Sequence, residues 1–171
     1  MIRALNENDV AAFIKIRCDS LQMSPSSFGA DPRPETEMDV QTTRRDLANK
    51  NDSNFILGYF EGAELAGIVG FIREQRLKTK HRSFIWGVFV YPAHRGKGIA
   101  TQLMEETMQR AKRLEGLQKV TLSVTDTSLA ARKVYEKLGF KEYAREPDAM
   151  RWEGEPLEEI FMSVALAPLE G

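Results

Sequence analysis

The sequence predicts an α+β domain in which about four helices flank a central mixed, mostly antiparallel sheet. Three apolar segments follow one another across short turns, which is typical of antiparallel strands. Two amphipathic segments then alternate with further strand-like segments, and the first can serve as a crossover helix. No internal repeat or linker interrupts this order, so a single domain over residues 1–171 accounts for the chain.

The composition is typical of a soluble globular protein. Hydrophobic residues make up 42% of the chain, charged residues make up 29%, and the formal net charge is -1. This balance lacks the basic excess of nucleic-acid-binding proteins, and no apolar run approaches the roughly 18 residues that span a bilayer. Because there is also no signal-peptide h-region and only one cysteine, Cys18, we expect a cytoplasmic protein with no nucleic-acid or membrane partner.

The N-terminal part is predicted to contain one strand and two helices. Residues 2–4 form a short strand, and Asn6 caps a helix over residues 7–22. One face of this helix carries Val10, Ile14, Arg17 and Leu21. An irregular segment rich in proline and serine separates it from a second, polar helix over residues 35–49.

Three strands of an antiparallel meander are predicted next. Residues 55–60 and 65–72 form two strands joined by a turn at Gly62, and residues 84–91 form the third. The charged segment over residues 74–82 lacks apolar periodicity, so we expect a solvated hairpin tip there.

The second half is predicted to alternate helices and strands. The helices cover residues 99–114 and 128–138, the strand between them residues 120–124, and the last two strands residues 140–145 and 160–166. We expect the C-terminal strand to be exposed, which would allow a homodimer.

A glycine loop over residues 88–100, V-F-V-Y-P-A-H-R-G-K-G-I-A, joins a buried strand to a helix. Gly96 and Gly98 let several backbone N–H groups point at one anion, while the helix dipole, Arg95 and Lys97 add attraction. This arrangement predicts a ligand that carries a pyrophosphate.

Two common phosphate-binding loops do not fit this segment. A P-loop requires Ser or Thr after its lysine, but Lys97 is followed by Gly98. A dinucleotide fingerprint requires a third glycine where this chain has Thr101.

Two motifs together resemble the GNAT acetyltransferase superfamily. Arg95, Gly98 and Ala100 match the pattern Q/R-x-x-G-x-G/A, and a second motif, A-A-R-K-V-Y-E-K-L-G-F, begins at Ala130. The resemblance extends over residues 2–166. It implies that acetyl-CoA is the co-substrate and that the protein is an acyltransferase.

The resemblance also implies where acetyl-CoA binds. The strand before the loop would pair with the pantetheine arm like an added strand, and the loop would bind the phosphates. The residues placed there are Val88, Phe89, Val90, Arg95, Gly96, Lys97, Gly98, Ile99, Ala100 and Thr101. Ser128 stands where the family commonly has a cofactor-contacting asparagine, and serine reaches less far.

Tyr135 is the predicted general acid, because it stands where the family has the tyrosine that protonates the leaving thiolate. A half-buried structural tyrosine is the alternative. Gly87, in the middle of a strand, indicates either a bulge that turns an N–H toward the thioester carbonyl or a close packing contact.

The general base stays open. Many members of the family have a glutamate on the strand before the loop or on the strand before the tyrosine helix, but here those strands offer Trp86 and Ser123. A water chain or a partly neutral amine could also serve. The titratable candidates are Glu74, His81, Asp126, Glu146 and Glu159. His81 and His94 lack metal-ligand spacing, so we expect no metal site, and we expect His94 to be solvated.

The acceptor is the least determined part of the predicted site. The resemblance implies an N-acetyltransferase that transfers acetyl to a primary amine of a small molecule or a protein by direct attack. Within the superfamily the chain resembles a bacterial subgroup whose substrates are largely unassigned. Phe28, Trp86, Trp152 and Glu159 could line its pocket, although aromatic residues beside a sheet are more often core, and we expect the proline-rich segment at the groove's edge. A non-catalytic acyl-CoA-binding module and an interaction protein that reuses the fold stay open as alternatives.

Overall fold

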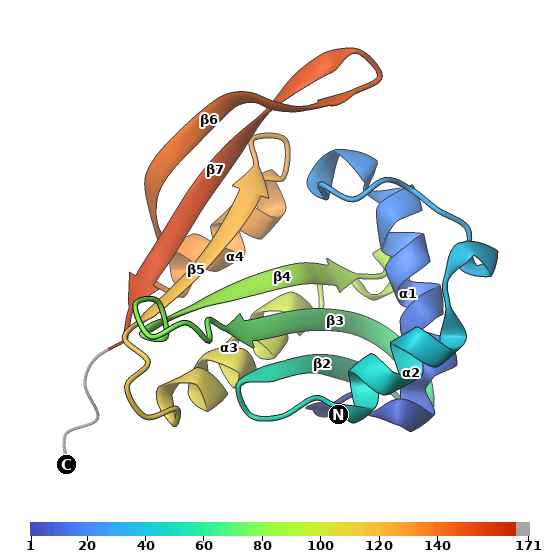
Figure 1. Cartoon of the computed structure of the whole chain (residues 1–171). Helices are drawn as coiled ribbons and strands as arrows, with labels where there is room; N and C mark the ends of the chain where they lie inside the picture. Colours follow the sequence, from blue (N-terminus) through green and yellow to red (C-terminus); the bar gives the residue numbers. More distant parts are fainter. Residues whose placement is uncertain (167–171) are drawn as a thin grey trace.

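One seven-stranded sheet organises residues 1–166, the part of the chain that this computed structural model describes (Figure 1). The strand order is β1-β2-β3-β4-β5-β7-β6. The strands are β1 (Ile2–Ala4), β2 (Asn54–Glu61), β3 (Glu64–Arg73), β4 (Arg82–Val90), β5 (Lys119–Thr125), β6 (Lys141–Trp152) and β7 (Glu155–Ala165). Only β4 and β5 pair in parallel, so the sheet is mixed and mostly antiparallel, which confirms the predicted fold class.

Helices cover both faces of this sheet (Figure 1). The helices are α1 (Val10–Met23), α2 (Val40–Ala48), α3 (Ile99–Lys112) and α4 (Leu129–Lys137). Alternate residues of β2 enter different cores: Ile56 packs with residues of α1 and α2, whereas Leu57 packs with residues of α3 and α4. The four predicted helices are therefore present on a sheet with two buried faces.

The first helix begins more tightly than the sequence predicts. Glu7–Asp9 form one 3-10 turn before α1, and Asn6 and Asp9 form a reciprocal capping box at its start. Arg3 of β1 also donates to both carboxylate oxygens of Asp9, at 2.7 Å each. These bonds fix the angle at which the chain leaves β1 and enters α1.

The predicted second helix over residues 35–49 is wrong in its first part. Glu35–Glu37 form a separate 3-10 turn, and the chain is extended at Met38. The side chain of Asp39 then accepts from the backbone N–H groups of Gln41 and Thr42, so α2 starts at Val40.

The last two strands are longer than predicted, and their order contradicts one expectation. The C-terminal strand β7 lies between β5 and β6, so the exposed edge strand is β6. The expected dimer through an exposed C-terminal strand therefore loses its basis. The β6–β7 hairpin projects as an arm above α4 and the segment that follows α1 (Figure 1).

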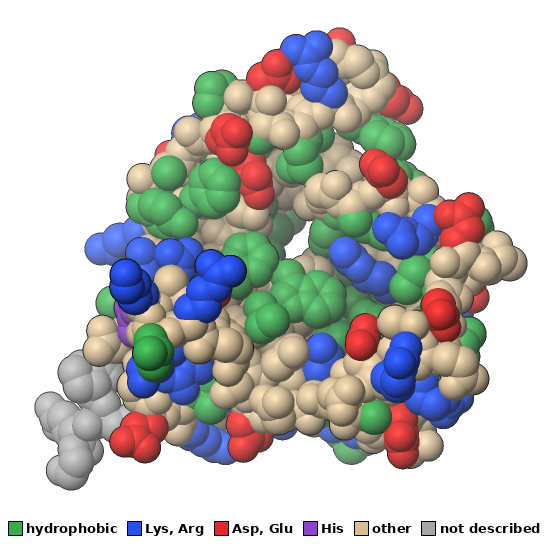
Figure 2. Space-filling view, in the orientation of Figure 1, with side chains coloured by type: hydrophobic (Ala, Val, Ile, Leu, Met, Phe, Trp, Pro, Cys, Tyr) green, Lys and Arg blue, Asp and Glu red, His purple; other side chains and the backbone are tan. Residues whose placement is uncertain are grey.

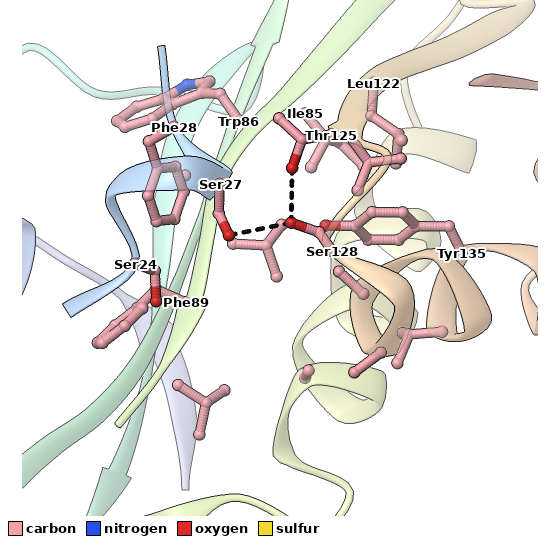
Figure 3. Close-up of a pocket in the computed structure, with 18 of the residues that line it drawn as sticks. Ser24, Ser27, Phe28, Ile85, Trp86, Phe89, Leu122, Thr125, Ser128 and Tyr135 are labelled. Atoms are coloured by element: carbon pink, nitrogen blue, oxygen red, sulfur yellow. Dashed lines mark hydrogen bonds between the residues drawn. The ribbon is translucent and has the colours of Figure 1, made fainter. Parts of the chain in front are cut away.

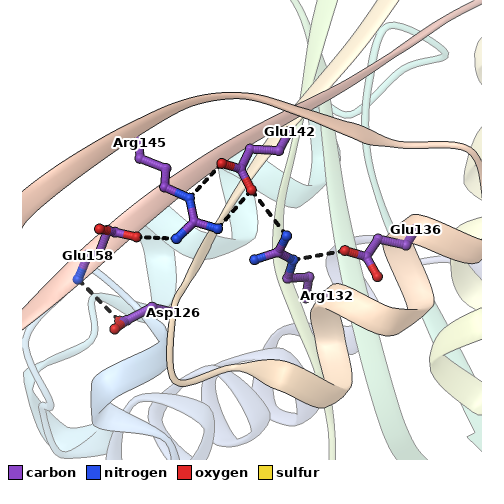
Figure 4. A network of polar contacts seen from close by, with 6 residues as sticks. All are labelled: Asp126, Arg132, Glu136, Glu142, Arg145 and Glu158. Carbon is purple, nitrogen blue, oxygen red and sulfur yellow. Dashed lines mark hydrogen bonds and ion pairs between the residues drawn. The ribbon is translucent and has the colours of Figure 1, made fainter.

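A network of ion pairs fixes this arm to α4 (Figure 4). Arg132 of α4 bonds both Glu136 of its own helix and Glu142 of β6, at 2.8 and 3.1 Å. Arg145 joins Glu142 to Glu158 of β7, at 2.5 Å for each closest contact. The network orients α4, the helix that carries Tyr135, relative to the arm.

Removing the carboxylate of Asp9 is expected to destabilise the fold. Asp9→Ala loses the capping box and the Arg3 pair, and we expect the free energy of unfolding to fall by about 1 to 2 kcal/mol. The Arg3 guanidinium lowers the pKa of Asp9. The carboxylate therefore stabilises the fold fully above the ordinary aspartate pKa of about 4, and this stabilisation is lost as pH falls through the lowered pKa. Asp9→Asn keeps the shape of the side chain and removes only its charge. In urea unfolding, the free energies of unfolding of Asp9→Asn and wild type should differ at pH 7 and converge in acid. A difference that does not change with pH would contradict the pairing.

Candidate active site

The sheet opens where β4 and β5 separate. They pair only between residues 82–84 and residues 119–121, after which β4 continues beside β3 and β5 beside β7. The ribbons diverge from this point (Figure 1). Within the described part of the chain, the edge of β4 that faces β5 therefore has no strand partner beyond Phe84.

The backbone of Val90 faces this gap. Val90 is paired with β3, but the next amide, that of Tyr91, donates to the Ala66 carbonyl at 3.0 Å. In an antiparallel pair this pattern turns the N–H and C=O of Val90 away from β3 and turns those of Phe89 toward it. The Val90 carbonyl accepts from Arg95 Nε at 3.0 Å. Of these two predicted cofactor contacts, the backbone of Val90 is available to a ligand and that of Phe89 is not.

The predicted β-bulge in β4 is confirmed. Between the pairs Trp86–Gly70 and Phe89–Ile68, β4 has two residues and β3 has one. Gly87 is the first of the two and has a φ of 63°, a conformation that favours glycine. The bulge changes the direction of the backbone N–H groups of β4 beside the gap. That one of these N–H groups donates to the thioester oxygen stays a prediction.

A pocket of about 700 Å³ occupies the gap. Its walls come from β4, the glycine loop, β5, α4 and the segment after α1 (Figure 3), and the space-filling view shows a hollow in this face of the molecule (Figure 2). The predicted site residues among its lining are Val88, Phe89, Val90, Arg95, Gly96, Gly98, Ile99, Ala100, Thr101, Ser128 and Tyr135. Lys97 is not among its lining residues.

The start of α3 has the geometry of an anion site. Gly98 is the N-cap with a φ of 75°, and it has no side chain to accept a hydrogen bond from the first turn. The first helical bond of α3 runs from Gln102 N to Gly98 O at 3.0 Å. The N–H groups of Ile99, Ala100 and Thr101 therefore have no intrahelical acceptor, and they point out at the positive end of the helix dipole.

Lys97 and His94 contact carboxylates at the β2–β3 turn, and of these two residues only His94 lines the pocket. Lys97 Nζ lies 3.3 Å from Glu61 Oε1, and about half of the Lys97 side chain is exposed. His94 lies between Glu61 and Glu64, with only 12% of its side chain exposed, so the prediction that it is solvated is wrong.

The Lys97–Glu61 pair predicts two opposite effects on acetyl-CoA affinity. Lys97→Gln removes a cation from the loop, so we expect the affinity for acetyl-CoA to fall by about threefold. Glu61→Gln removes the anion that neutralises this cation, so we expect the affinity to rise by about threefold. Calorimetry at low and high salt would measure both changes, which added salt should diminish. Equal affinities for both variants at low salt would show that the charge of the loop does not act on the ligand.

Tyr135 lies on the wall of the pocket opposite Phe28 and Trp86 (Figure 3). Its side chain is buried, and its ring packs 6.2 Å from the ring of Phe140. Burial raises the pKa of Tyr135 above its ordinary value. The hydroxyl therefore stays protonated at neutral pH, as a proton donor must.

Ser128 belongs to a chain of hydroxyl groups across the pocket (Figure 3). Its Oγ lies 2.9 Å from Ser27 Oγ and 2.8 Å from Thr125 Oγ1. Ser27 lies in a 3-10 turn, Pro25–Ser27, so this contact joins the segment after α1 to the β5–α4 junction. The sequence does not reveal this pair, because 101 positions separate its members.

Only one of the five titratable candidates for the general base lines the pocket, and that residue is Glu159 of β7. Asp126 instead accepts from the backbone N–H of Glu158 at 3.1 Å. Glu74 and His81 flank the β3–β4 turn, where β4 begins, whereas the glycine loop follows the end of β4.

Arg17, Phe28 and Trp86 form the end of the pocket beside the bulge. The guanidinium of Arg17 lies 5.5 Å from the Phe28 ring and 5.7 Å from the Trp86 ring. Sequence reasoning placed Arg17 on the inner face of a helix but gave it no role; an arginine on an otherwise apolar face is the signal that could have identified it. Trp152, predicted here, is not among the lining residues.

Residues 1–166 contain neither a membrane-spanning helix nor a cluster of metal-ligating side chains. None of the helices within residues 1–166 is long and apolar enough to cross a bilayer. In the same range, no group of three or more His, Cys, Asp or Glu side chains is arranged to hold a metal ion.

Comparison with known proteins identifies the family. The model of the acetyltransferase (GNAT) family matches residues 12–140, so the chain belongs to this family, which confirms the predicted family and its acyltransferase class. The uncharacterized N-acetyltransferase YycN of Bacillus subtilis is 36% identical over 63 residues, which make up 37% of this chain and 40% of that protein.

Solved structures share the fold at low sequence identity. The structure of yncA from Salmonella typhimurium with its cofactor acetyl-CoA has a TM-score of 0.83 and 21% identity, over 100% of this chain and 96% of that chain. A GNAT-family acetyltransferase from Streptococcus pneumoniae has a TM-score of 0.82 and 19% identity, over 98% of this chain and 99% of that chain.

Proposed function

We propose that the protein transfers the acetyl group of acetyl-CoA to a primary amine of a small molecule or a protein by direct attack. One observation carries the proposal: a single pocket joins the free N–H groups at the start of α3, the unpaired edge of β4 and the side chain of Tyr135. The likeness to yncA, whose structure contains acetyl-CoA, supports the choice of donor.

The pocket has groups suited to each part of acetyl-CoA, which supplies a thioester acyl group when bound. The N–H groups of Ile99, Ala100 and Thr101 would bind its pyrophosphate. The gap-facing backbone of Val90 would pair with the extended pantetheine arm. A backbone N–H at the Gly87 bulge would donate to the carbonyl oxygen.

The reaction then needs a neutral amine and one proton donor. The amine nitrogen forms a bond to the acetyl carbon as the carbon–sulfur bond breaks, and Tyr135 gives its hydroxyl proton to the leaving thiolate. The proton that the amine loses passes to water or to Glu159, and the Tyr135 hydroxyl is restored from solvent. The products are the acetylated amine and free CoA.

A non-catalytic acyl-CoA-binding module is the second candidate. It is favoured by Trp86 of β4 and Ser123 of β5, because neither side chain is suited to act as a general base for the amine. Both candidates predict acetyl-CoA binding, but only the enzyme predicts release of free thiol.

An acetyl-CoA consumption screen separates the two candidates. Free CoA is measured with a thiol reagent over amino acids, polyamines, aminoglycosides and peptides, and the acetylated product is identified by mass. We expect amine-dependent thiol release with at least one class. Calorimetric binding of acetyl-CoA without any amine-dependent release would favour the binding module.

A further inference from the structure

Arg17 has no partner for its charge in the part of the chain that the structure describes. Its guanidinium takes part in no ion pair and no hydrogen bond within residues 1–166, and its Nη1 is buried without an acceptor. Arg3, Arg110, Arg132, Arg145 and Arg151 each pair with a carboxylate. Burying an unpaired guanidinium is costly, so a position of this kind in a pocket wall is suited to an anionic ligand.

No carboxylate within residues 1–166 forms an ion pair with Arg17. Burial and the positive charge of nearby Arg33 lower the pKa of Arg17. The neighbouring pocket residues Phe28 and Trp86 offer only aromatic faces, which attract a cation but do not satisfy its N–H groups. A ligand carboxylate could accept two parallel hydrogen bonds from the guanidinium.

The position of Arg17 separates it from the phosphate site. A Cβ added to Gly87 would lie 3.7 Å from Arg17 Nη1, so the guanidinium lies beside the bulge. Gly87 precedes Val90 by three residues of strand, which span about 10 Å, and the glycine loop lies beyond Val90. Because the bulge is where the thioester carbonyl is proposed to lie, an anion on Arg17 would belong to the acceptor and not to the phosphates of CoA.

The rest of this end of the pocket matches a small acceptor with an apolar part. Met150 of the arm lines the same pocket as Phe28 and Trp86, and so does Glu159, whose carboxylate is suited to an ammonium group. A Cβ at Gly29 would lie 3.5 Å from the sulfur of Met150, so the segment after α1 meets the arm here. A cation, a carboxylate and apolar walls are together complementary to a zwitterion with an apolar side chain.

We propose that the acceptor is a small amino acid with an apolar side chain, whose carboxylate binds Arg17 while its amine faces the bulge. This inference rests on the proposed acetyl transfer and narrows its acceptor class. A protein N-terminus is disfavoured, because its first residue carries a peptide bond in place of the carboxylate.

The test compares each acid with its amide. Phenylalanine, leucine and methionine are assayed beside phenylalaninamide, leucinamide and methioninamide, with kcat/KM expressed per neutral amine. For wild type we expect at least one acid to exceed its amide by about 10²-fold. Arg17→Gln should abolish this preference by slowing the acid alone, and Arg17→Lys should restore part of it. Arg113→Gln, at an exposed position outside the pocket lining, is the control and should keep the preference.

A second measurement keeps the inference testable if no amine is acetylated. Calorimetry of CoA-saturated protein compares N-acetylphenylalanine with N-acetylphenylalaninamide. Tighter binding of the acid, lost in Arg17→Gln while CoA affinity is unchanged, supports the carboxylate site even if the transferase activity is absent. If wild type shows equal kcat/KM for acid and amide, or binds the two acetylated products with equal affinity, the inference is overturned. The proposed acetyl transfer is unaffected by that result as long as turnover is observed. Should Arg17→Gln fail to fold, the wild-type comparison decides.

Discussion

Replacing Tyr135 with phenylalanine is expected to slow acetyl transfer by about 10²- to 10⁴-fold while acetyl-CoA affinity stays unchanged. The ring would still fill the same buried volume beside Phe140, so packing should survive. Only the proton donor on the pocket wall is removed. Burial raises the pKa of the Tyr135 phenol. Burial would also raise the pKa of the CoA thiol in the same pocket, so it does not by itself make proton transfer from the phenol to the thiolate less favourable.

The measurement is kcat at saturating acetyl-CoA and acceptor. Tyr143→Phe is the matched control, because Tyr143 is about half exposed on β6 and outside the pocket lining. Because the pKa of Tyr135 is raised, its hydroxyl keeps its proton as pH rises, so wild type should show no loss of kcat from this group below about pH 10. If Tyr135→Phe has the same kcat as wild type, Tyr135 has a structural role and is not the proton donor.

Gly98→Val is expected to weaken acetyl-CoA binding by about tenfold or more, equivalent to at least about 1.4 kcal/mol. Gly98 has a φ of 75°, which a β-branched residue rarely adopts, and its added side chain would stand at the mouth of the anion site. The nearest protein atom to an added Cβ is Gln102 Nε2 at 3.9 Å, so the damage should come from strain and from the ligand's path and not from a clash within the protein.

Gly62→Val provides the control for backbone strain. Gly62 has a φ of 61° in the β2–β3 turn, and an added Cβ meets nothing within 4 Å. Both variants should lose comparable stability, about 1 to 3 kcal/mol, but only Gly98→Val should lose affinity in calorimetry. Unchanged affinity in a folded Gly98→Val protein would remove the start of α3 from the binding site.

The sequence was sufficient for the elements whose signals are local. The loop predicted from Gly96 and Gly98 is present, with positive φ angles at both glycines, and the amphipathic segment that follows it forms α3 with one buried face. Gly87 indicated either a bulge or a close packing contact, and β4 has the bulge. In each case the residue type alone restricts the backbone or the face.

The errors arise where distant contacts decide the structure. Residues 35–38 have the polar composition of a surface helix, which led to the prediction. The Asp39 side chain, however, accepts from the N–H groups of the first turn of α2, so the helix starts only after Asp39. The first eight residues of β6 are exposed and show no apolar alternation, so its length comes from pairing with β7. The Ser27–Ser128 contact and the unpaired charge of Arg17 depend on the approach of segments far apart in the chain.

Residue-resolved amide hydrogen exchange with and without acetyl-CoA tests most directly whether acetyl-CoA occupies the gap between β4 and β5. We expect slowed exchange at Ile99, Ala100 and Thr101, where the N–H groups have no intrahelical acceptor, and at the gap-facing amide of Val90. The amide of Phe89, already turned toward β3, should change least. The proposed site would be contradicted if saturating acetyl-CoA did not slow amide exchange at Val90 and in the first turn of α3. It would also be contradicted if acetyl-CoA slowed exchange on a different face of the sheet instead.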